Sequence, residues 1–206
     1  MMTPVVDSLS ELPLVVDTMN VSLNRMGSMK NWSFARTVYS RMENLKAATH
    51  LRLAGKNAGD SFELILADSL VKHGVSKDRI VRNVKADAAD ADADILILPK
   101  SGNNKALIIM AKTSIRERWK QEDRDGLCFT QNIHNCWGDV CNQYGLMVRY
   151  PPSVWAVMFR ERPHYSIEHN LAIAYDKGGK SASIQPDQFI CAYDEEGMSR
   201  LLDSCL

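Results

Sequence analysis

The sequence lacks long apolar runs and any excess of charge of one sign. No stretch approaches the ~18 consecutive apolar residues of a membrane-spanning helix, so we expect no association with a membrane. Lysine and arginine together number 25, as do aspartate and glutamate, and the formal net charge is therefore zero. This balance argues against a diffuse electrostatic attraction to nucleic acid, but it leaves room for a local basic cleft.

Paired cysteine motifs and a secretion signal are also absent. The five cysteines are odd in number and contain no C-x-x-C pair, which predicts reduced thiols and a cytoplasmic protein. His134 lies near Cys136 and Cys141, but their spacing matches no common zinc pattern. The first residues, MMTPVVDSLSELPLVVDTMN, carry no basic segment, so we expect no secretion signal.

What is present is ordinary globular composition. The 206 residues are 45% hydrophobic and 24% charged, which suits one domain with a core. We find no internal repeat, low-complexity tail or linker, and alternating helix and strand patterns predict a single α/β domain. The weaker patterns predict strands at 79–85, 154–159 and 171–175, and helices at 131–144 and 194–206.

Two segments have the apolar spacing of helices. The first opens at residues 31–33 and places its apolar residues at three- and four-residue intervals. Its basic residues lie mostly off that stripe, so they either form a solvated face or contact phosphates. The stripe is Phe34, Val38, Met42, Leu45 and Ala48, and the basic residues are Arg36, Arg41, Lys46, Arg52 and Lys56.

The second helix is expected to begin at Gly59-Asp60 and to end at Gly74, which would act as its C-terminal cap. Within it, Glu63 has two possible roles. Asp60 and Glu63 have the spacing of an N-cap and its reciprocal partner, which would make Glu63 structural. The alternative is that Glu63 is an outer carboxylate of a metal site.

Two short apolar runs predict a β-hairpin, with strands at 95–98 and 106–111 joined by a turn at 101–104. Asp94 precedes the first strand and Lys112 follows the second. Because the start of one antiparallel strand lies beside the end of the next, we expect Asp94 and Lys112 to lie close together. Asp90 is the alternative to Asp94, while Asp87 and Asp92 are expected to face solvent.

A charged segment follows the hairpin directly. Ser114-Ile115-Arg116-Glu117 has the form of a capping box, which predicts a helix beginning at Thr113 or Ser114. An acid beside a lysine on neighbouring strands is the minimal set for cutting a phosphodiester. Carboxylates can hold Mg²⁺, which makes a bound water more acidic, and the lysine stabilises the negative transition state.

These residues resemble one nuclease superfamily. An aspartate followed on the next strand by (D/E)-x-K is the pattern of PD-(D/E)xK nucleases. Within it, KTSIRERWKQ (112–121) is similar to the lysine-to-recognition-helix segment of type II restriction endonucleases that cut CCGG, CCNGG and CCWGG sites. The strong resemblance covers about fifteen residues and, when Glu63 and Asp94 are counted, a looser one spans 59–125.

The resemblance implies the restriction-endonuclease-like fold of that superfamily, a central mixed β-sheet flanked by helices. It also implies one endonuclease domain over 1–206. That domain would comprise a helical N-terminal part (1–58), a catalytic and recognition core (59–125), and the remaining helices and strands (126–206).

One position departs from the superfamily pattern. Met110 stands two residues before Lys112, where the pattern has an acid. In the restriction group named above, the second acid has moved to the helix beyond the lysine, at a spacing that here falls on Asp125. Glu122 is a nearby alternative.

The resemblance thus implies a catalytic set and a set of metal ligands for Mg²⁺. No small-molecule cofactor beyond the metal is expected. The catalytic residues would be Asp94, Lys112 and Asp125, with Glu63 as a possible fourth carboxylate, and the metal ligands would be Asp94, Asp125, Glu63 and Glu122.

The same group reads bases with the charged residues just after the lysine, which here are Arg116, Glu117 and Arg118. Arginine can donate twice to guanine, and glutamate can accept from the amine of cytosine, if the helix enters the major groove by its N-terminus. Lys120 completes the proposed DNA-binding set. The structural alternatives are that Glu117 only completes the capping box and that Arg118 pairs with Glu122.

The function implied is a type II restriction endonuclease. It would make Mg²⁺-dependent double-strand cuts at a short palindromic site containing G·C pairs, as a homodimer on double-stranded DNA in a bacterial or archaeal cytoplasm. Two alternatives stay open. One is a repair-type or nicking nuclease of the same superfamily, and the other is a catalytically silent, sequence-specific DNA-binding protein, suggested by Met110.

Replacing Arg116 with alanine tests base reading. Arg116→Ala should lose about 1–3 kcal/mol of binding free energy on cognate DNA and little on random DNA, because a bidentate contact to guanine is specific. Gel-shift titrations on both DNAs measure the two losses. An equal loss on random DNA would make Arg116 a phosphate contact.

Overall fold

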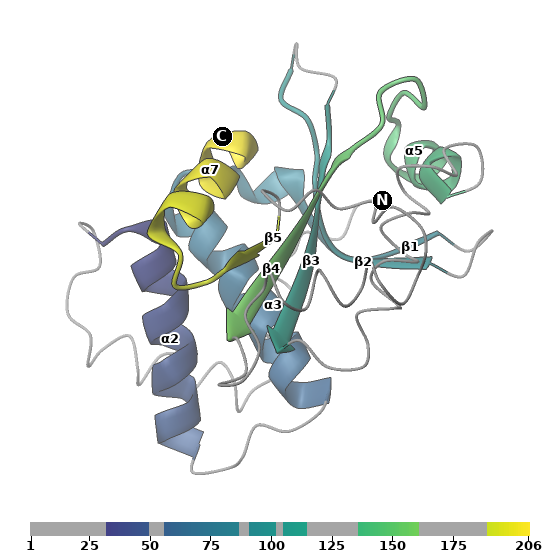
Figure 1. Ribbon diagram of the computed structural model, residues 1–206. Coiled ribbons are helices and arrows are strands. Elements are labelled where there is room, and N and C mark those ends of the chain that lie inside the picture. Colours follow the sequence, from purple (N-terminus) through teal and green to yellow (C-terminus); the bar gives the residue numbers. More distant parts are fainter. Residues whose placement is uncertain (1–31, 50–55, 87–90, 102–104, 115–135, 161–188) are drawn as a thin grey trace, which may run out of the picture.

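The computed structural model describes residues 32–49, 56–86, 91–101, 105–114, 136–160 and 189–206. Within these ranges a five-stranded mixed sheet lies between helices on its two faces (Figure 1). The helices are α2 (Phe34–Thr49), α3 (Lys56–Lys72), α5 (Gly138–Tyr144) and α7 (Glu195–Cys205). The strands are β1 (Ile80–Ala86), β2 (Ala91–Ile97), β3 (Leu107–Ser114), β4 (Ser153–Arg160) and β5 (Phe189–Cys191).

The sheet joins two kinds of strand pairing. Its order is β1-β2-β3-β4-β5; β1, β2 and β3 pair antiparallel, whereas β3, β4 and β5 pair parallel. The expected α/β class with a mixed sheet flanked by helices is confirmed. β3 is buried between β2 and β4, in agreement with its uninterrupted apolar run.

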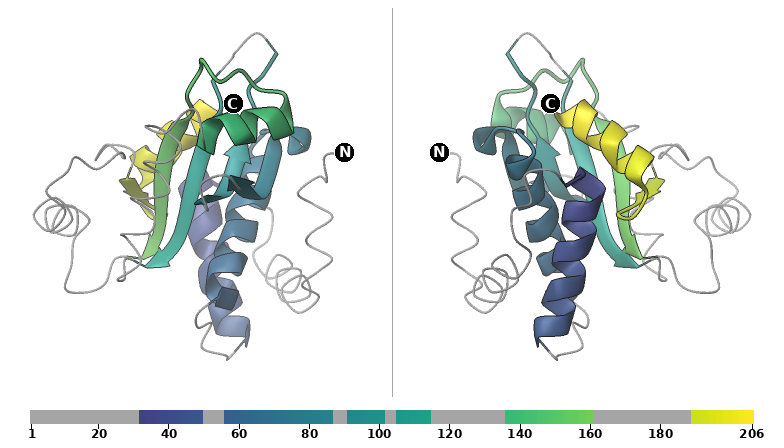
Figure 2. Two further views of the ribbon diagram at one scale, coloured as in Figure 1. Left: turned by 90° about the vertical axis from the view of Figure 1, so that its right-hand side faces the viewer. Right: turned by 90° about the vertical axis from the view of Figure 1, so that its left-hand side faces the viewer.

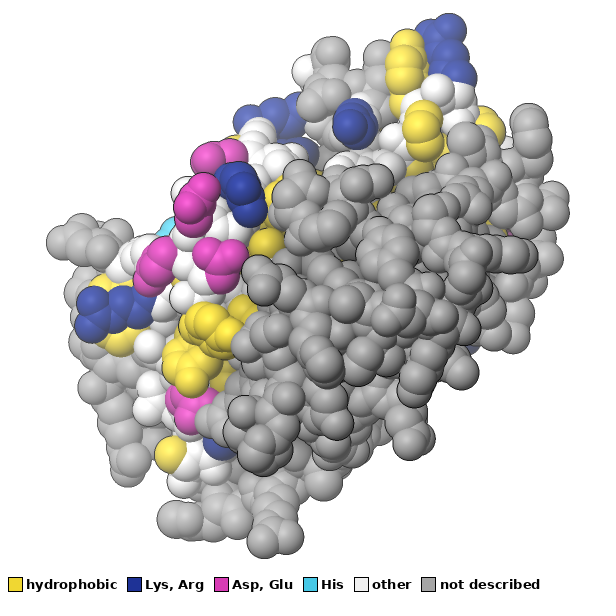
Figure 3. Space-filling view, in the orientation of Figure 1, with side chains coloured by type: hydrophobic (Ala, Val, Ile, Leu, Met, Phe, Trp, Pro, Cys, Tyr) yellow, Lys and Arg dark blue, Asp and Glu magenta, His cyan; other side chains and the backbone are white. Residues whose placement is uncertain are grey.

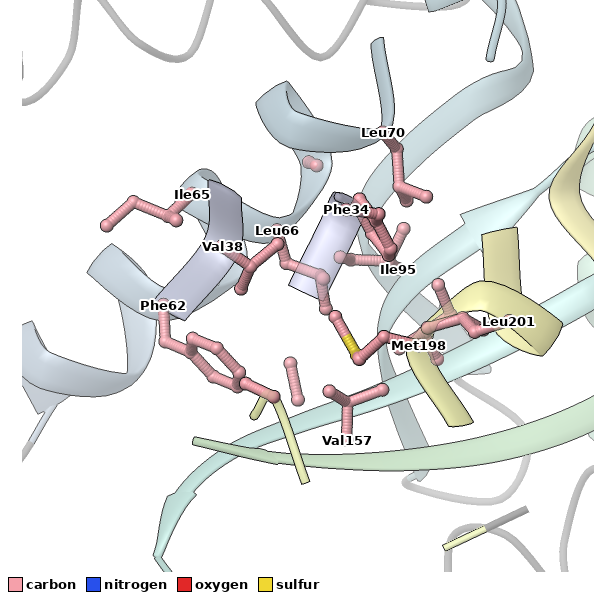
Figure 4. Close-up of a cluster of buried hydrophobic side chains, with 14 of the residues drawn as sticks. Phe34, Val38, Phe62, Ile65, Leu66, Leu70, Ile95, Val157, Met198 and Leu201 are labelled. Atoms are coloured by element: carbon pink, nitrogen blue, oxygen red, sulfur yellow. The ribbon is translucent and has the colours of Figure 1, made fainter. Parts of the chain in front are cut away.

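The larger core lies on the face of the sheet covered by α2, α3 and α7, which we call the helical face (Figure 2). Phe34, Val38, Met42 and Leu45 of the predicted stripe are buried there. Phe62, Leu66 and Met198 pack beside them, above Val157 of β4 (Figure 4). Each fully buried side chain of this size contributes about 1.5–3 kcal/mol relative to an exposed one. This packing fixes α3, and with it Glu63, against the sheet.

The opposite face is covered by α5 and is called the α5 face (Figure 2). Its cluster includes Trp137, Val140, Ile108 and Met110. Trp137 donates from Nε1 to the backbone oxygen of Tyr150 at 3.0 Å, so its polar atom is satisfied despite burial. The two cores together hold the middle strands from both sides.

α7 turns its acidic residues to solvent. Asp194 caps the helix by accepting from the Gly197 amide at 3.0 Å, which confirms the expected terminal helix. Acidic side chains gather over this helix in Figure 3, and the exposed acids of α7 are Glu195, Glu196 and Asp203.

α3 begins earlier than the sequence suggested. Its first residue is Lys56, so Gly59 and Asp60 lie inside the helix and the predicted start at Gly59-Asp60 is wrong. The predicted cap at its other end is confirmed. Gly74 has φ 101°, and the Gly74 and Val75 amides donate to Val71 and Leu70 at 3.1 and 3.0 Å. This is a Schellman ending, which favours glycine at the left-handed position.

β3 extends further than expected. Thr113 and Ser114 belong to the strand, and Ser114 pairs with Arg160 of β4. The predicted helix start at Thr113 or Ser114 is therefore wrong. Parallel pairing with a strand some forty residues later overrides the local capping-box signal.

Two of the basic residues predicted to lie off the apolar stripe of α2, Arg41 and Lys46, contact other parts of the protein. Arg41 is buried, with Nη2 2.6 Å from Asp68 Oδ2 and Nη1 donating to Ser69 Oγ at 3.0 Å. Lys46 lies 4.0 Å from the centre of the Phe159 ring. These contacts tie α2 to α3 and β4, because a buried arginine needs a counter-ion.

Three cysteines are free, as expected, and they are also buried, namely Cys141, Cys191 and Cys205. Cys136 is disulfide-bonded, so the expectation of five reduced thiols is wrong. A disulfide needs only that two Cβ atoms approach in space, and sequence spacing does not show this. The cysteines therefore give no support for a reducing compartment.

No helix in the described part of the chain is long and apolar enough to cross a membrane. Asp92 is exposed as predicted, whereas Asp87, Asp90 and the predicted strand at 171–175 lie outside the described residues.

Two glycine substitutions should have opposite effects. Gly74→Ala should lower the free energy of unfolding by about 1 kcal/mol, because a Cβ is disfavoured at the left-handed backbone. Gly59→Ala, the matched control within α3, should raise it by about 0.5–1 kcal/mol, because alanine is the better helix former. A Cβ at Gly59 would meet nothing within 4 Å. Urea unfolding followed by circular dichroism measures both, and effects of equal sign would contradict this account.

Candidate functional site

Asp94 and Lys112 meet across β2 and β3. Lys112 Nζ lies 3.0 Å from Asp94 Oδ2, and the backbone amide of Ala111 donates to the same oxygen at 2.7 Å. The predicted proximity of Asp94 and Lys112 is thus confirmed. The expected strand boundary is wrong, because β2 begins at Ala91 and Asp94 lies within it.

The strand pairing explains why the carboxylate reaches this amide. β2 pairs with β3 from Ile97–Leu107 to Ile95–Ile109, and the pairing extends no further toward Asp94. β3 continues beyond Ile109. On the side that faces β2, its Ala111 amide donates to the Asp94 side chain instead of to a backbone carbonyl of β2. The Asp94 carboxylate therefore fills the place of a missing ladder bond and is held in a defined orientation.

Glu63 approaches the same place from α3. Its Oε2 lies 3.3 Å from Arg82 Nη2 of β1, and both side chains are almost fully buried. The proposed capping role of Glu63 is wrong, since Asp60 is inside α3 and cannot be its N-cap. The charge of Asp94 also acts on Glu63, so a second carboxylate lies near Asp94.

The electrostatic environment of Glu63 links the four charged groups. The pKa of Glu63 is raised from 4.5 to about 7, chiefly by burial and also by the negative charge of Asp94. Arg82 and then Lys112 act in the opposite direction. Glu63 is therefore close enough to Asp94 and Lys112 to feel both charges, and Glu63, Arg82, Asp94 and Lys112 form one cluster.

A partly buried cluster of two acidic and two basic side chains is poor evidence that these side chains stabilise the fold. Removing such charges from water costs several kcal/mol per ion, and pairing only roughly repays that cost. Buried acids whose pKa is raised by burial and by another carboxylate are more typical of functional sites. The cluster is therefore our candidate site.

The carboxylates of the cluster suit a hard divalent cation. Mg²⁺ prefers oxygen ligands and is commonly held by one or two carboxylates together with water and substrate phosphates. Both contacts of Asp94 use Oδ2, so Oδ1 is not needed for either. In the described ranges no group of three or more His, Cys, Asp or Glu gathers that could hold a metal ion, and Glu63 and Asp94 are the two carboxylates of the cluster.

Met110 is buried in the core of the α5 face. It therefore packs the sheet and brings no ligand, and the second carboxylate among the described residues comes from α3 instead. The remaining predicted residues lie outside the described part of the chain: Arg116, Glu117, Arg118, Lys120, Glu122 and Asp125.

Arg82 is the member of the candidate site that sequence reasoning missed. It lies in the middle of β1, which was correctly expected as a strand. The sequence signal for Arg82 was a charged residue between the apolar Val81 and Val84, in a strand expected to be partly buried. Its partner could not be named, because Glu63 precedes it on a helix and only the packing of α3 brings the two together.

Comparison with known proteins gives no match for this chain. No protein-family model matches it, and neither the curated proteins nor the solved structures contain a significant relative. Any function assigned to this protein therefore depends on the cluster itself.

The raised pKa of Glu63 predicts how stability depends on pH. Between pH 4.5 and about 7 the folded protein holds a proton on Glu63 that the unfolded chain releases. This contribution is fully present below pH 4.5 and is lost as the pH rises through about 7, so stability falls over that window. Its size is on the order of a few kcal/mol at most.

Glu63→Gln should remove this part of the pH dependence and leave the variant more stable than the original protein above pH 7. Urea unfolding at several pH values between 4 and 8 measures the difference. Glu196→Gln is the matched control, because Glu196 is exposed on α7. The account fails if Glu63→Gln and the original protein lose stability in parallel across the window.

Proposed function

We propose that this protein is a Mg²⁺-dependent endonuclease of the PD-(D/E)xK superfamily that cuts double-stranded DNA at a short palindromic site, a type II restriction endonuclease. The observation that carries the proposal is the contact between Lys112 Nζ and Asp94 Oδ2 at 3.0 Å, on adjacent antiparallel strands of a mixed sheet. The presence of Glu63 beside this pair supports it.

Asp94 and Glu63 are the described residues that would hold the cation. When bound, Mg²⁺ supplies positive charge to the scissile phosphate and makes a water molecule a better nucleophile at neutral pH. Asp94 is well oriented for this role because the Ala111 amide fixes one of its oxygens. Glu63 is held by Arg82, which limits its freedom within the buried site.

Lys112 has a separate role. Its ammonium group is only partly buried, so a phosphate can approach it from solvent. By donating hydrogen bonds from Nζ, it would stabilise the negative charge that builds on the phosphate during hydrolysis. Its contact with Asp94 keeps it near the carboxylates before DNA arrives.

The proposed base-reading residues follow this site closely in the chain. β3 ends at Ser114, two residues beyond Lys112. After Ile115 come Arg116, Glu117 and Arg118. With Lys120 they would contact DNA whose scissile phosphate lies at Lys112. A two-fold homodimer would present this set to each half of a palindrome. Asp125 or Glu122 would supply a further carboxylate.

The burial of Met110 favours a second candidate function. The superfamily's usual acid would lie at this position, and a methionine packed among apolar residues binds no metal. If Glu63 does not replace that acid, the protein is a catalytically silent, sequence-specific DNA-binding protein.

Incubating the protein with phage DNA and Mg²⁺ separates these readings. Discrete fragments indicate restriction, whereas smearing or nicks indicate a repair-type nuclease of the same superfamily. Tight binding without cutting indicates the silent protein. Neither cutting nor binding on any DNA would remove the nuclease proposal altogether.

Lys112→Ala should abolish cleavage, with a loss of at least ~100-fold in rate, and leave specific binding in place, because the lysine acts on the transition state. Nicking and gel-shift assays on one DNA measure the two effects. Lys100→Ala is the matched control, since Lys100 is exposed at the end of the same hairpin. Retained cleavage in Lys112→Ala would remove Lys112 from the mechanism.

A further inference from the structure

Asn83 has an unusual backbone conformation for a residue inside a strand. Its φ is 53°, and among the described residues it is the only non-glycine residue with positive φ. This left-handed region is disfavoured for most residues, and asparagine is among the few side chains that enter it readily. Asn83 follows Arg82 directly, so it lies one residue from the cluster.

The strand pairing is interrupted at the same place. Arg82 pairs with Ile95 and Val84 pairs with Ala93, in one continuous register, but the pair between them is missing. The two skipped residues are Asn83 of β1 and, opposite it, Asp94 of β2. The interruption is therefore shared by both strands and centred on the catalytic carboxylate.

In both strands, the side chains on either side of this interruption lie on different faces of the sheet. Residues two apart in a regular strand share one face. Arg82 nevertheless contacts Glu63 on the helical face, whereas Val84 is buried on the α5 face. Likewise Ile95 is on the helical face and Ala93 on the α5 face. The β1–β2 ribbon thus turns over between these pairs.

The turn accounts for the separation of β2 from β3. Beyond Asp94 the β1–β2 ribbon leaves β3 and runs toward α5, as Figure 1 shows, where Gln143 Nε2 donates to the Lys85 oxygen at 3.0 Å. On its β2 side, β3 is left without a strand partner at Ala111, and Asp94 Oδ2 accepts a hydrogen bond from this amide. The orientation of Asp94 therefore follows from the backbone turn.

We propose that Asn83 is a positioning residue of this site, because its left-handed backbone turns the β1–β2 ribbon and directs Asp94 across to Ala111 and Lys112. The inference rests on the proposed function in treating Asp94 as catalytic. The side chain of Asn83 is exposed, so the position requires a backbone conformation and not a particular side-chain contact.

Alanine and glycine at this position separate backbone conformation from side-chain chemistry. Both remove the amide group, but only glycine adopts the left-handed region without steric cost. Asn83→Gly should keep the Asp94–Ala111 hydrogen bond, and Asn83→Ala should lose it. Lys85→Ala, at an exposed position of the same strand that pairs with Asp92, is the matched control and should keep it.

The readout is the backbone amide of Ala111 in metal-free protein, followed by nuclear magnetic resonance. Asp94→Ala gives the chemical shift and the exchange rate of this amide when the bond is broken. Asn83→Ala should match that reference, with hydrogen-exchange protection of Ala111 falling at least tenfold. Asn83→Gly should match the original protein. A structural role without positioning would alter stability but leave the Ala111 amide signal in place.

An intact Ala111 signal in Asn83→Ala, or a lost one in Asn83→Gly, would overturn the inference. If Asn83→Ala does not fold, Asn83→Gly decides alone, since loss of its Ala111 signal contradicts the proposal and retention supports it. Cleavage should follow the same order, with Asn83→Ala reduced about 100-fold, as expected for a misplaced catalytic group. Absence of cleavage in the original protein would contradict the nuclease proposal while leaving the amide result to test Asn83.

Discussion

One carboxylate oxygen, Asp94 Oδ2, connects two strands at the point where their backbone pairing stops. It accepts the Ala111 amide at 2.7 Å and lies 3.0 Å from Lys112 Nζ. Without it, the sheet would leave a β3 amide unpaired in its interior, which costs about 1–3 kcal/mol. The sheet therefore requires an acceptor at this place, and an aspartate provides one that also carries charge.

The other charged groups can be understood from that charge. Glu63 lies close enough to Asp94 for its pKa to be raised, while Arg82 and Lys112 offset part of the repulsion. Such an arrangement costs desolvation energy that hydrophobic side chains would not cost. A divalent cation bound by both carboxylates would relieve the repulsion, which gives the proposed nuclease function its physical basis.

The sequence was informative where structure is local or regular. The apolar stripe of α2 and the hairpin of β2 and β3 followed from periodicity, and Gly74 was recognisable as a helix cap. Contacts between distant segments decided the rest. Pairing with β4 continued β3 through Ser114 against its capping-box signal, and the packing of α3 brought Glu63 to Arg82.

The candidate site was predictable in part for the same reason. The proximity of Asp94 and Lys112 was predictable from antiparallel geometry alone, because it depends only on the register of the hairpin. The left-handed turn at Asn83 was not predictable from the sequence. Asparagine is common in turns and loops, and no local sequence signal shows that one residue pair is missing from the β1–β2 ladder. The turn depends on β1 and β2 turning over together, so that the side chains of both strands move to the other face of the sheet.

Paramagnetic broadening by Mn²⁺, used as a substitute for Mg²⁺, tests most directly whether Glu63 and Asp94 form one cation site. We expect substoichiometric Mn²⁺ to broaden first the amide signals of Glu63, Asp94 and Ala111, with the effect lost in Asp94→Ala. The exposed acids of α7 serve as the internal control. Broadening that begins at α7 and spares Glu63 and Asp94 would contradict the account.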